Sequence, residues 1–143
     1  MASRYELGIV GGTASLAMAQ CELRAGAADS IWVKEVGVFL NAATASTIGL
    51  GKPANTPAGG TPVLGQATNG GAAAVGGVVT TGWSTAPTAP TIFYRRMGLP
   101  AAIGNGIIWT FQGDGLLIPV AGSLVVWNVT LGAIASVYWV WEE

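Results

Sequence analysis

The chain contains no histidine and a single cysteine, Cys21. Histidine is the commonest general base near neutral pH and the commonest metal ligand, so its absence argues against an enzyme and against a zinc centre. A single cysteine cannot form a disulfide within the chain, which favours synthesis in a reducing cytoplasm. We therefore expect no catalytic residues, no metal site and no cofactor.

Charged residues are scarce as well. They make up 9% of the chain, with a net charge of −1, whereas about 25% is typical of soluble domains. Only Arg95 and Arg96 are adjacent basic residues, so no basic stripe is available for nucleic-acid phosphates. Glycine, proline and polar residues interrupt every long apolar run, which argues against a membrane helix, and we find no signal-peptide pattern. A surface this poor in charge is expected to be covered by other subunits.

The sequence is rich instead in glycine, with 22 residues, and in short β-branched and aromatic runs cut by turn signals, a pattern typical of all-β proteins. In the last run Val137, Trp139 and Trp141 share one face, because alternate residues of a strand point the same way. The glycine-rich segments 104–106 and 113–115 predict hairpin-type turns, and hence a meander of closely spaced strands in the second half. Strands are expected at residues 3–10, 16–25, 31–40, 91–99, 107–112, 116–120, 123–130 and 136–142.

Segment 41–90 has a different composition. It is mostly alanine, glycine, threonine and proline, and Lys52 is its only charged residue. Short strands are predicted near residues 47–50, 62–64 and 74–80, and the remainder is expected to form long loops. A structureless stretch of this length is unusual inside a compact domain. We interpret residues 1–143 as one β-sandwich domain with 41–90 as an extended loop or arm insertion, either ordered against a neighbouring subunit or mobile at the surface.

Two patterns that could carry chemistry have simpler interpretations. Glu6 and Glu22 could be cross-strand neighbours, but Arg4 and Arg24 beside them indicate a surface charge ladder rather than a glycosidase pair. The six tryptophans fit core residues, interface anchors or a ligand platform. The candidate interface residues are Lys52, Trp83, Arg95, Arg96, Trp139 and Trp141.

Several segments carry a family resemblance. They are the run Glu22-Leu23-Arg24, segments 33–38, 49–53, 93–96, 99–100 and 108–111, and above all segment 117–128, which reads LIPVAGSLVVWN. Together they resemble small virion proteins of tailed bacteriophages, of the capsid decoration or cement type. The resemblance implies a jelly-roll-like β-sandwich, often trimeric, that packs on the capsid. It transfers no catalytic residue, because the implied function is packing.

From residues and resemblance together we expect an all-β, jelly-roll-like antiparallel β-sandwich with a long Ala/Gly/Thr/Pro-rich loop or arm. The expected function is that of a structural, non-enzymatic virion protein that stabilises the phage head. Its expected partners are further copies of itself, as a homotrimer, and the major capsid protein, with neither nucleic acid nor membrane. The expected location is the capsid surface of the virion, after synthesis in the host cytoplasm. A tail, neck or head-fibre subunit and a glycan-binding virion module are the alternatives.

Overall fold

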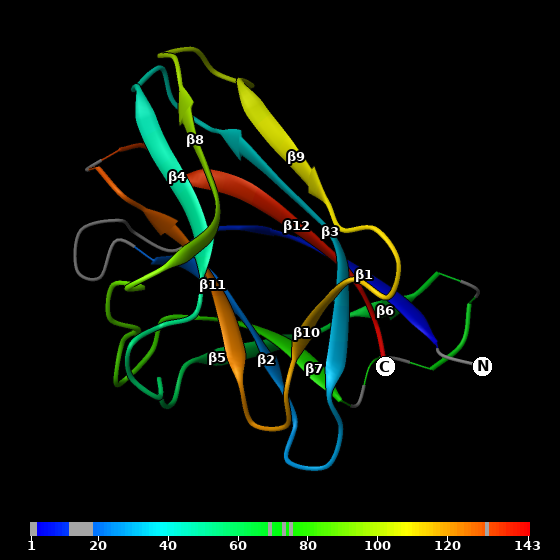
Figure 1. Ribbon diagram of the computed structural model, residues 1–143. Coiled ribbons are helices and arrows are strands. Elements are labelled where there is room, and N and C mark those ends of the chain that lie inside the picture. Colours follow the sequence, from blue (N-terminus) through cyan, green and yellow to red (C-terminus); the bar gives the residue numbers. More distant parts are fainter. Residues whose placement is uncertain (1–2, 12–18, 69, 73, 75, 131) are drawn as a thin grey trace.

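The computed structural model describes residues 3–11, 19–68, 70–72, 74, 76–130 and 132–143. Within these residues it has twelve strands and no helix. The strands form two antiparallel sheets that face each other (Figure 1), so the predicted all-β sandwich is confirmed. The strands are β1 (Arg4–Val10), β2 (Ala19–Ala25), β3 (Ile31–Leu40), β4 (Ser46–Gly51), β5 (Thr61–Leu64), β6 (Gln66–Ala67), β7 (Gly77–Thr81), β8 (Phe93–Leu99), β9 (Gly106–Thr110), β10 (Leu116–Ile118), β11 (Ser123–Asn128) and β12 (Ala135–Glu142).

The first sheet, sheet A, has the order β10-β3-β12-β1-β6, and β9 also pairs with β3. The carboxy-terminal strand β12 lies in its middle, where Trp139 pairs with Leu7 of β1 on one side and with Val36 of β3 on the other. The predicted bounds of β3 are confirmed. Of the predicted strand 16–25, residues 19–25 form β2, and residues 16–18 lie outside the described residues.

The second sheet, sheet B, has the order β5-β7-β2-β11-β4-β8. All six residues of β11 are buried, as expected for a strand that is covered on both faces. Its inward residues Leu124 and Val126 belong to the main core, whereas Val125 and Trp127 form a second small cluster with Ala19, packed against Trp83, Phe93 and Val129. Sheet B therefore packs on sheet A with one face and buries part of its other face as well.

The predicted meander of the second half is wrong. β8 and β11 belong to sheet B, whereas β9, β10 and β12 belong to sheet A, so no strand of this half pairs with its successor. Segment 104–106 passes from sheet B to sheet A. Segment 113–115 joins two strands that both pair with β3, and Lys34 Nζ holds it there through the Asp114 carbonyl oxygen at 2.9 Å. Glycine marks where the chain turns, but it does not select the strand with which the next segment pairs.

Segment 41–90 contains the predicted short strands near residues 47–50, 62–64 and 74–80, as β4, β5 and β7, but these strands pair within sheet B of the same subunit. It contributes β4, β5, β6 and β7, and β4 lies between β11 and β8 inside sheet B. The loops between these strands contact other residues of the same subunit. Ala58 forms an isolated antiparallel β-bridge with Thr85, and Asn55 Nδ2 donates a hydrogen bond to the Ala86 carbonyl oxygen at 2.9 Å. The jelly-roll connectivity is not confirmed, because a jelly roll has eight strands and each sheet here has six.

Candidate interaction surfaces

The structure places Trp139 and Trp141 in the core and not at an interface. Both indoles are fully buried, and Tyr5 stacks on Trp141 with ring centroids 5.9 Å apart. The predicted shared face of Val137, Trp139 and Trp141 is confirmed, but that face points at sheet B. A side chain with no exposed surface cannot contact a partner, so the assignment of these two residues to an interface is wrong.

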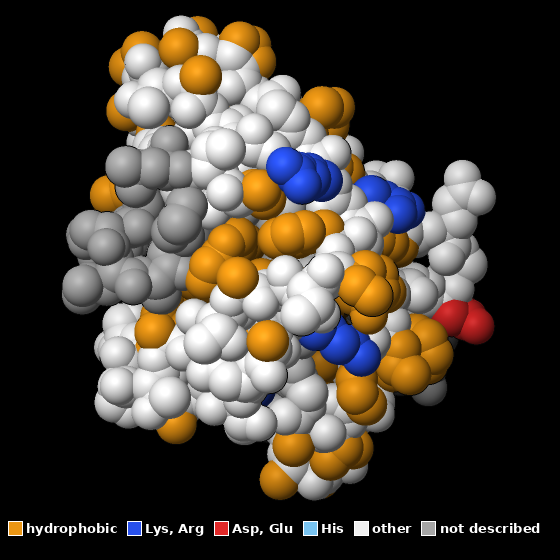
Figure 2. All heavy atoms as spheres, turned by 60° about the vertical axis from the view of Figure 1, so that its left-hand side comes forward, with side chains coloured by type: hydrophobic (Ala, Val, Ile, Leu, Met, Phe, Trp, Pro, Cys, Tyr) orange, Lys and Arg blue, Asp and Glu red, His pale blue; other side chains and the backbone are white. Residues whose placement is uncertain are grey.

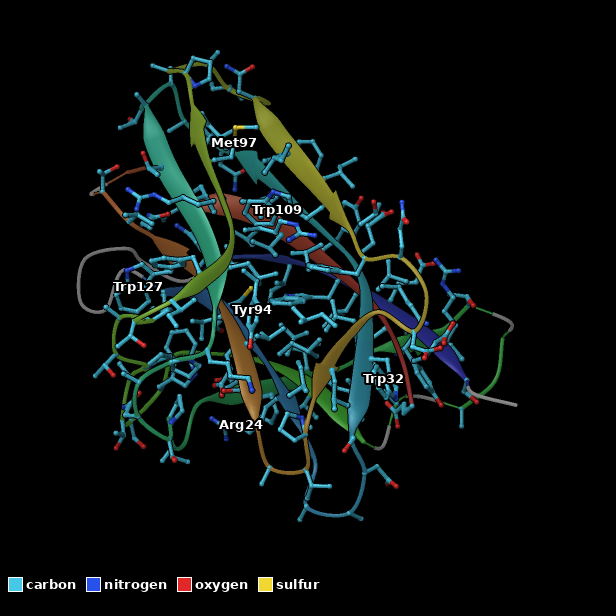
Figure 3. All side chains as sticks on the ribbon, viewed as in Figure 1. Arg24, Trp32, Tyr94, Met97, Trp109 and Trp127 are labelled. Atoms are coloured by element: carbon cyan, nitrogen blue, oxygen red, sulfur yellow. The ribbon has the colours of Figure 1, made fainter. Side chains whose placement is uncertain are left out.

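Trp83 fixes a covering loop to sheet B. It precedes the described segment 84–92 and packs on the cluster of Ala19, Val125 and Trp127. Its indole Nε1 donates a hydrogen bond to Glu22 Oε2 at 2.7 Å. Much of the Trp83 indole therefore contacts residues of its own subunit and is not free to contact a partner. Trp127 lies on the same face of sheet B (Figure 3).

Glu22 is the centre of a buried polar cluster on this face and is not part of an exposed charge ladder with Glu6. The carboxylate is fully buried, and Arg24 binds it through both Nε and Nη2, at 3.0 and 2.9 Å. Arg24 Nη2 also donates to the Pro57 carbonyl oxygen at 3.0 Å. The pair thus ties segment 52–60 to β2, where sequence reasoning placed only surface charges.

Lys52 is exposed at the mouth of a hollow beside this cluster. The hollow has a volume of about 500 Å³, and Arg24, Asn55, Pro57 and Ser123 also line it. Arg24 is already paired with Glu22, so the net charge at the hollow comes mainly from Lys52. Lys52 remains an exposed candidate contact residue.

Arg95 and Arg96 lie on β8, which is an edge strand of sheet B. Both are exposed, but they are used differently. The Arg95 guanidinium lies over the Phe111 ring, with its Cζ 5.0 Å from the centroid, and so connects the two sheets. Arg96 lies opposite Gly49 of β4, and as the next residue of the strand it points to the opposite face of sheet B from Arg95.

Beside these arginines lies a group of exposed apolar side chains that sequence reasoning missed. β8 contacts β9, the neighbouring edge strand of sheet A, and Figure 3 shows Met97 and Trp109 in the space between them. We call this group the β8–β9 rim. Its members are Ile92, Tyr94, Met97, Ile103 and Ile108, and each exposes between 38% and 74% of its surface.

The other two sheet edges are shorter. β5 has four residues and contains Pro62, and β6 has two residues. Short strands and proline are common devices by which proteins prevent edge-to-edge association. β8 has seven residues and no proline. The face that includes β8 is largely uncharged, with a few separate basic groups and apolar patches between them (Figure 2).

The outer face of sheet A carries a second feature, a pair of partly exposed aromatic rings. Phe39 and Tyr138 stack with their centroids 6.4 Å apart and their planes 16° apart. The Tyr138 hydroxyl donates a hydrogen bond to Glu35 Oε1 at 2.6 Å. Partial burial raises the pKa of Tyr138 to about 12, and the hydrogen bond to Glu35 and the charges of Glu35 and Glu6 act in the same direction.

Among the described residues, no three or more Cys, Asp or Glu side chains lie close enough together to hold a metal ion. No helix in the described part of the chain is long and apolar enough to span a membrane. Comparison of the chain with protein-family models, with curated proteins and with solved structures finds no match.

Proposed function

We propose that the protein is a structural subunit of a tailed-phage virion, a decoration or cement protein that stabilises the head by packing. In this proposal it assembles with further copies of itself, as a trimer, and with the major capsid protein at the capsid surface. The role in the virion rests on the sequence resemblance, and the mode of action rests on the surface of the subunit.

The β8–β9 rim is the observation that carries the proposal. Tyr94 and Met97 lie exposed on β8 and Ile108 on β9, whereas Ile92 precedes β8 and Ile103 lies in the connection between these two edge strands. Exposed edges offer unpaired backbone groups to another chain, and apolar burial adds about 25 cal/mol per Å² before association costs. A standard interface of about 800 Å² per partner would cover roughly an eighth of the 6709 Å² surface.

Light scattering coupled to gel filtration tests the self-association. We expect a trimer for the natural chain and a smaller species for Tyr94→Lys, because the new ammonium group would be buried at the interface. Val63→Lys is the matched control, since Val63 and Tyr94 are both 38% exposed but Val63 lies on the proline-containing edge β5. A monomeric natural chain, or dissociation by Val63→Lys alone, would contradict the rim as the interface.

A head-binding experiment tests the role in the virion. Purified heads that lack the protein are mixed with it and examined by sedimentation and electron microscopy. We expect saturable binding at regular lattice positions and a higher rupture temperature of the heads. Binding to tails or to host cells, without binding to heads, would replace decoration by a tail, neck or head-fibre role.

A further inference from the structure

The two rings on the outer face of sheet A lie flat against the sheet. A methyl group on Gly37 would collide with the Tyr138 ring, and one on Gly106 would collide with the Phe39 ring. Gly37 and Gly106 are on the adjacent strands, opposite Tyr138 and Phe39 respectively. Each ring therefore leans over a neighbouring glycine in the same direction across the sheet. Their near-parallel planes make one platform, and one ring face of each residue is directed away from the sheet.

A groove continues this platform across the sheet. One hollow of about 280 Å³ is lined by Gly8, Val10, Phe39, Ser136 and Tyr138. A second hollow of about 410 Å³ is lined by Glu6, Gly8, Gln66 and Thr68. The two hollows share Gly8, whose missing side chain leaves the floor open between them. We call the two hollows together the β1 groove.

Polar side chains surround the apolar platform. Glu35 lies at the Tyr138 hydroxyl, and Glu6, Gln66 and Thr68 are exposed along the second hollow. Carboxylate, amide and hydroxyl groups offer both acceptors and donors. Glu6 and Glu35 contribute two carboxylates to this region and Arg4, on the same face of β1 as Glu6, contributes one cation, so the net charge is negative and disfavours an anionic ligand.

We propose that the β1 groove binds an oligosaccharide of neutral or amino sugars. A pyranose ring has an apolar face of C–H groups, which stacks on an aromatic ring, and an equator of hydroxyl groups, which bind carboxylates and amides. The groove supplies both surfaces in one line, the rings of Phe39 and Tyr138 and then the polar groups of Glu6, Gln66 and Thr68. The proposal does not require the role in the virion, because it rests on side chains of sheet A other than the β8–β9 rim, although Ile108 of that rim lies on the same face, in register with Gly37.

Gly8→Val is the decisive variant. A Cβ atom at Gly8 would meet only Tyr138 Cβ, at 4.0 Å, and Gly8 does not have a positive φ. Valine suits an exposed strand position, so the variant should fold while it fills the junction of the two hollows. Tyr138→Ala removes one stacking ring. Trp32→Ala is the control, because Trp32 is an exposed aromatic residue on β3 at the far end of the strand from Phe39 (Figure 3), roughly 23 Å along it.

The probes are maltohexaose, cellohexaose and chitohexaose, together with a glycan array. Isothermal titration calorimetry measures affinity, and circular dichroism confirms folding of each variant. We expect binding of at least one probe, weakened about tenfold or more by Gly8→Val and by Tyr138→Ala and unchanged by Trp32→Ala. No binding by the natural chain, or equal binding by folded Gly8→Val, would overturn the proposal. If the natural chain binds no sugar and its oligomer dissociates in Gly8→Val, the β1 groove holds a second copy of the chain. That result would likewise overturn the proposal.

Discussion

The buried pair of Glu22 and Arg24 allows a quantitative test of how segment 52–60 is held to sheet B. Glu22 has no exposed surface, and its carboxylate accepts hydrogen bonds from Arg24 Nε, Arg24 Nη2 and Trp83 Nε1 at 3.0, 2.9 and 2.7 Å. In Arg24→Leu the carboxylate keeps its burial and loses its counter-charge. Arg24 also bonds to the Pro57 carbonyl oxygen, so the same variant releases the loop.

Removal of one partner of a buried ion pair typically costs 3–5 kcal/mol of unfolding free energy. The Arg24 side chain is 28% exposed, so solvent weakens its interaction with Glu22 and we expect a value of about 3 kcal/mol. For a domain of this size the melting temperature should fall by roughly 6–12 °C. Urea unfolding followed by circular dichroism measures the free energy, and calorimetry measures the temperature.

Two companion variants make the test specific. Lys52→Leu removes an exposed cation near the same hollow and should change stability by no more than about 0.5 kcal/mol. The double variant Glu22→Leu with Arg24→Leu removes both charges and should recover most of the loss, because hydrophobic replacement of a complete buried pair is often neutral. If Arg24→Leu costs no more than Lys52→Leu, or if the double variant is less stable than Arg24→Leu alone, the reasoning is refuted.

Three further predictions follow from buried and shifted groups. The pKa of Tyr138 is raised to about 12, so as pH rises this tyrosine ionises first in the unfolded chain, and its contribution to the unfolding free energy should be complete below about pH 10 and be lost between pH 10 and 12. Glu35→Gln should lower the pH at which absorbance at 295 nm reports ionisation of Tyr138. An unchanged titration would contradict the role of Glu35 in raising the pKa of Tyr138. Burial raises the pKa of the Cys21 thiol to about 12, so iodoacetamide should modify the folded chain at pH 8 far more slowly than the urea-unfolded chain, and equal rates would show that Cys21 is accessible. Trp139→Ala should cost about 3–5 kcal/mol in urea unfolding, whereas a cost below about 1 kcal/mol would show that the indole is not packed as described.

Alternation and turn signals predict most strand positions here, because they are local properties of the chain. The bounds of β3 and the shared face of Val137, Trp139 and Trp141 on β12 follow from the order of apolar residues alone. Pairing is not local. Nothing near segments 104–106 or 113–115 indicates that β9 and β10 both pair with β3.

For the functional surfaces, too, the sequence predicts local features but not those that depend on strand pairing. The sequence places Arg95 and Arg96 on a strand and among the candidate interface residues, and the structure leaves both exposed. It also assigns Trp139 and Trp141 to an interface, because alternation does not say which face of a strand is covered. The platform of Phe39 and Tyr138 depends on which glycines lie opposite the rings. That information requires the register, so composition could not reveal the β1 groove.

The central position of β12 has a consequence for the order of events during synthesis. Residues 135–142 separate β3 from β1 in sheet A, and residues 123–128 separate β2 from β4 in sheet B. Neither sheet can close until these residues have left the ribosome, about 100 residues after β3, which takes roughly 5–20 s at about 5–20 residues per second. During that interval β1 and β3 lack the strand that lies between them, and β2 lacks β11, so their apolar inner faces are not yet covered by complete sheets. A nascent chain stalled near residue 120 should therefore bind chaperones more strongly than a chain that includes residues 123–142.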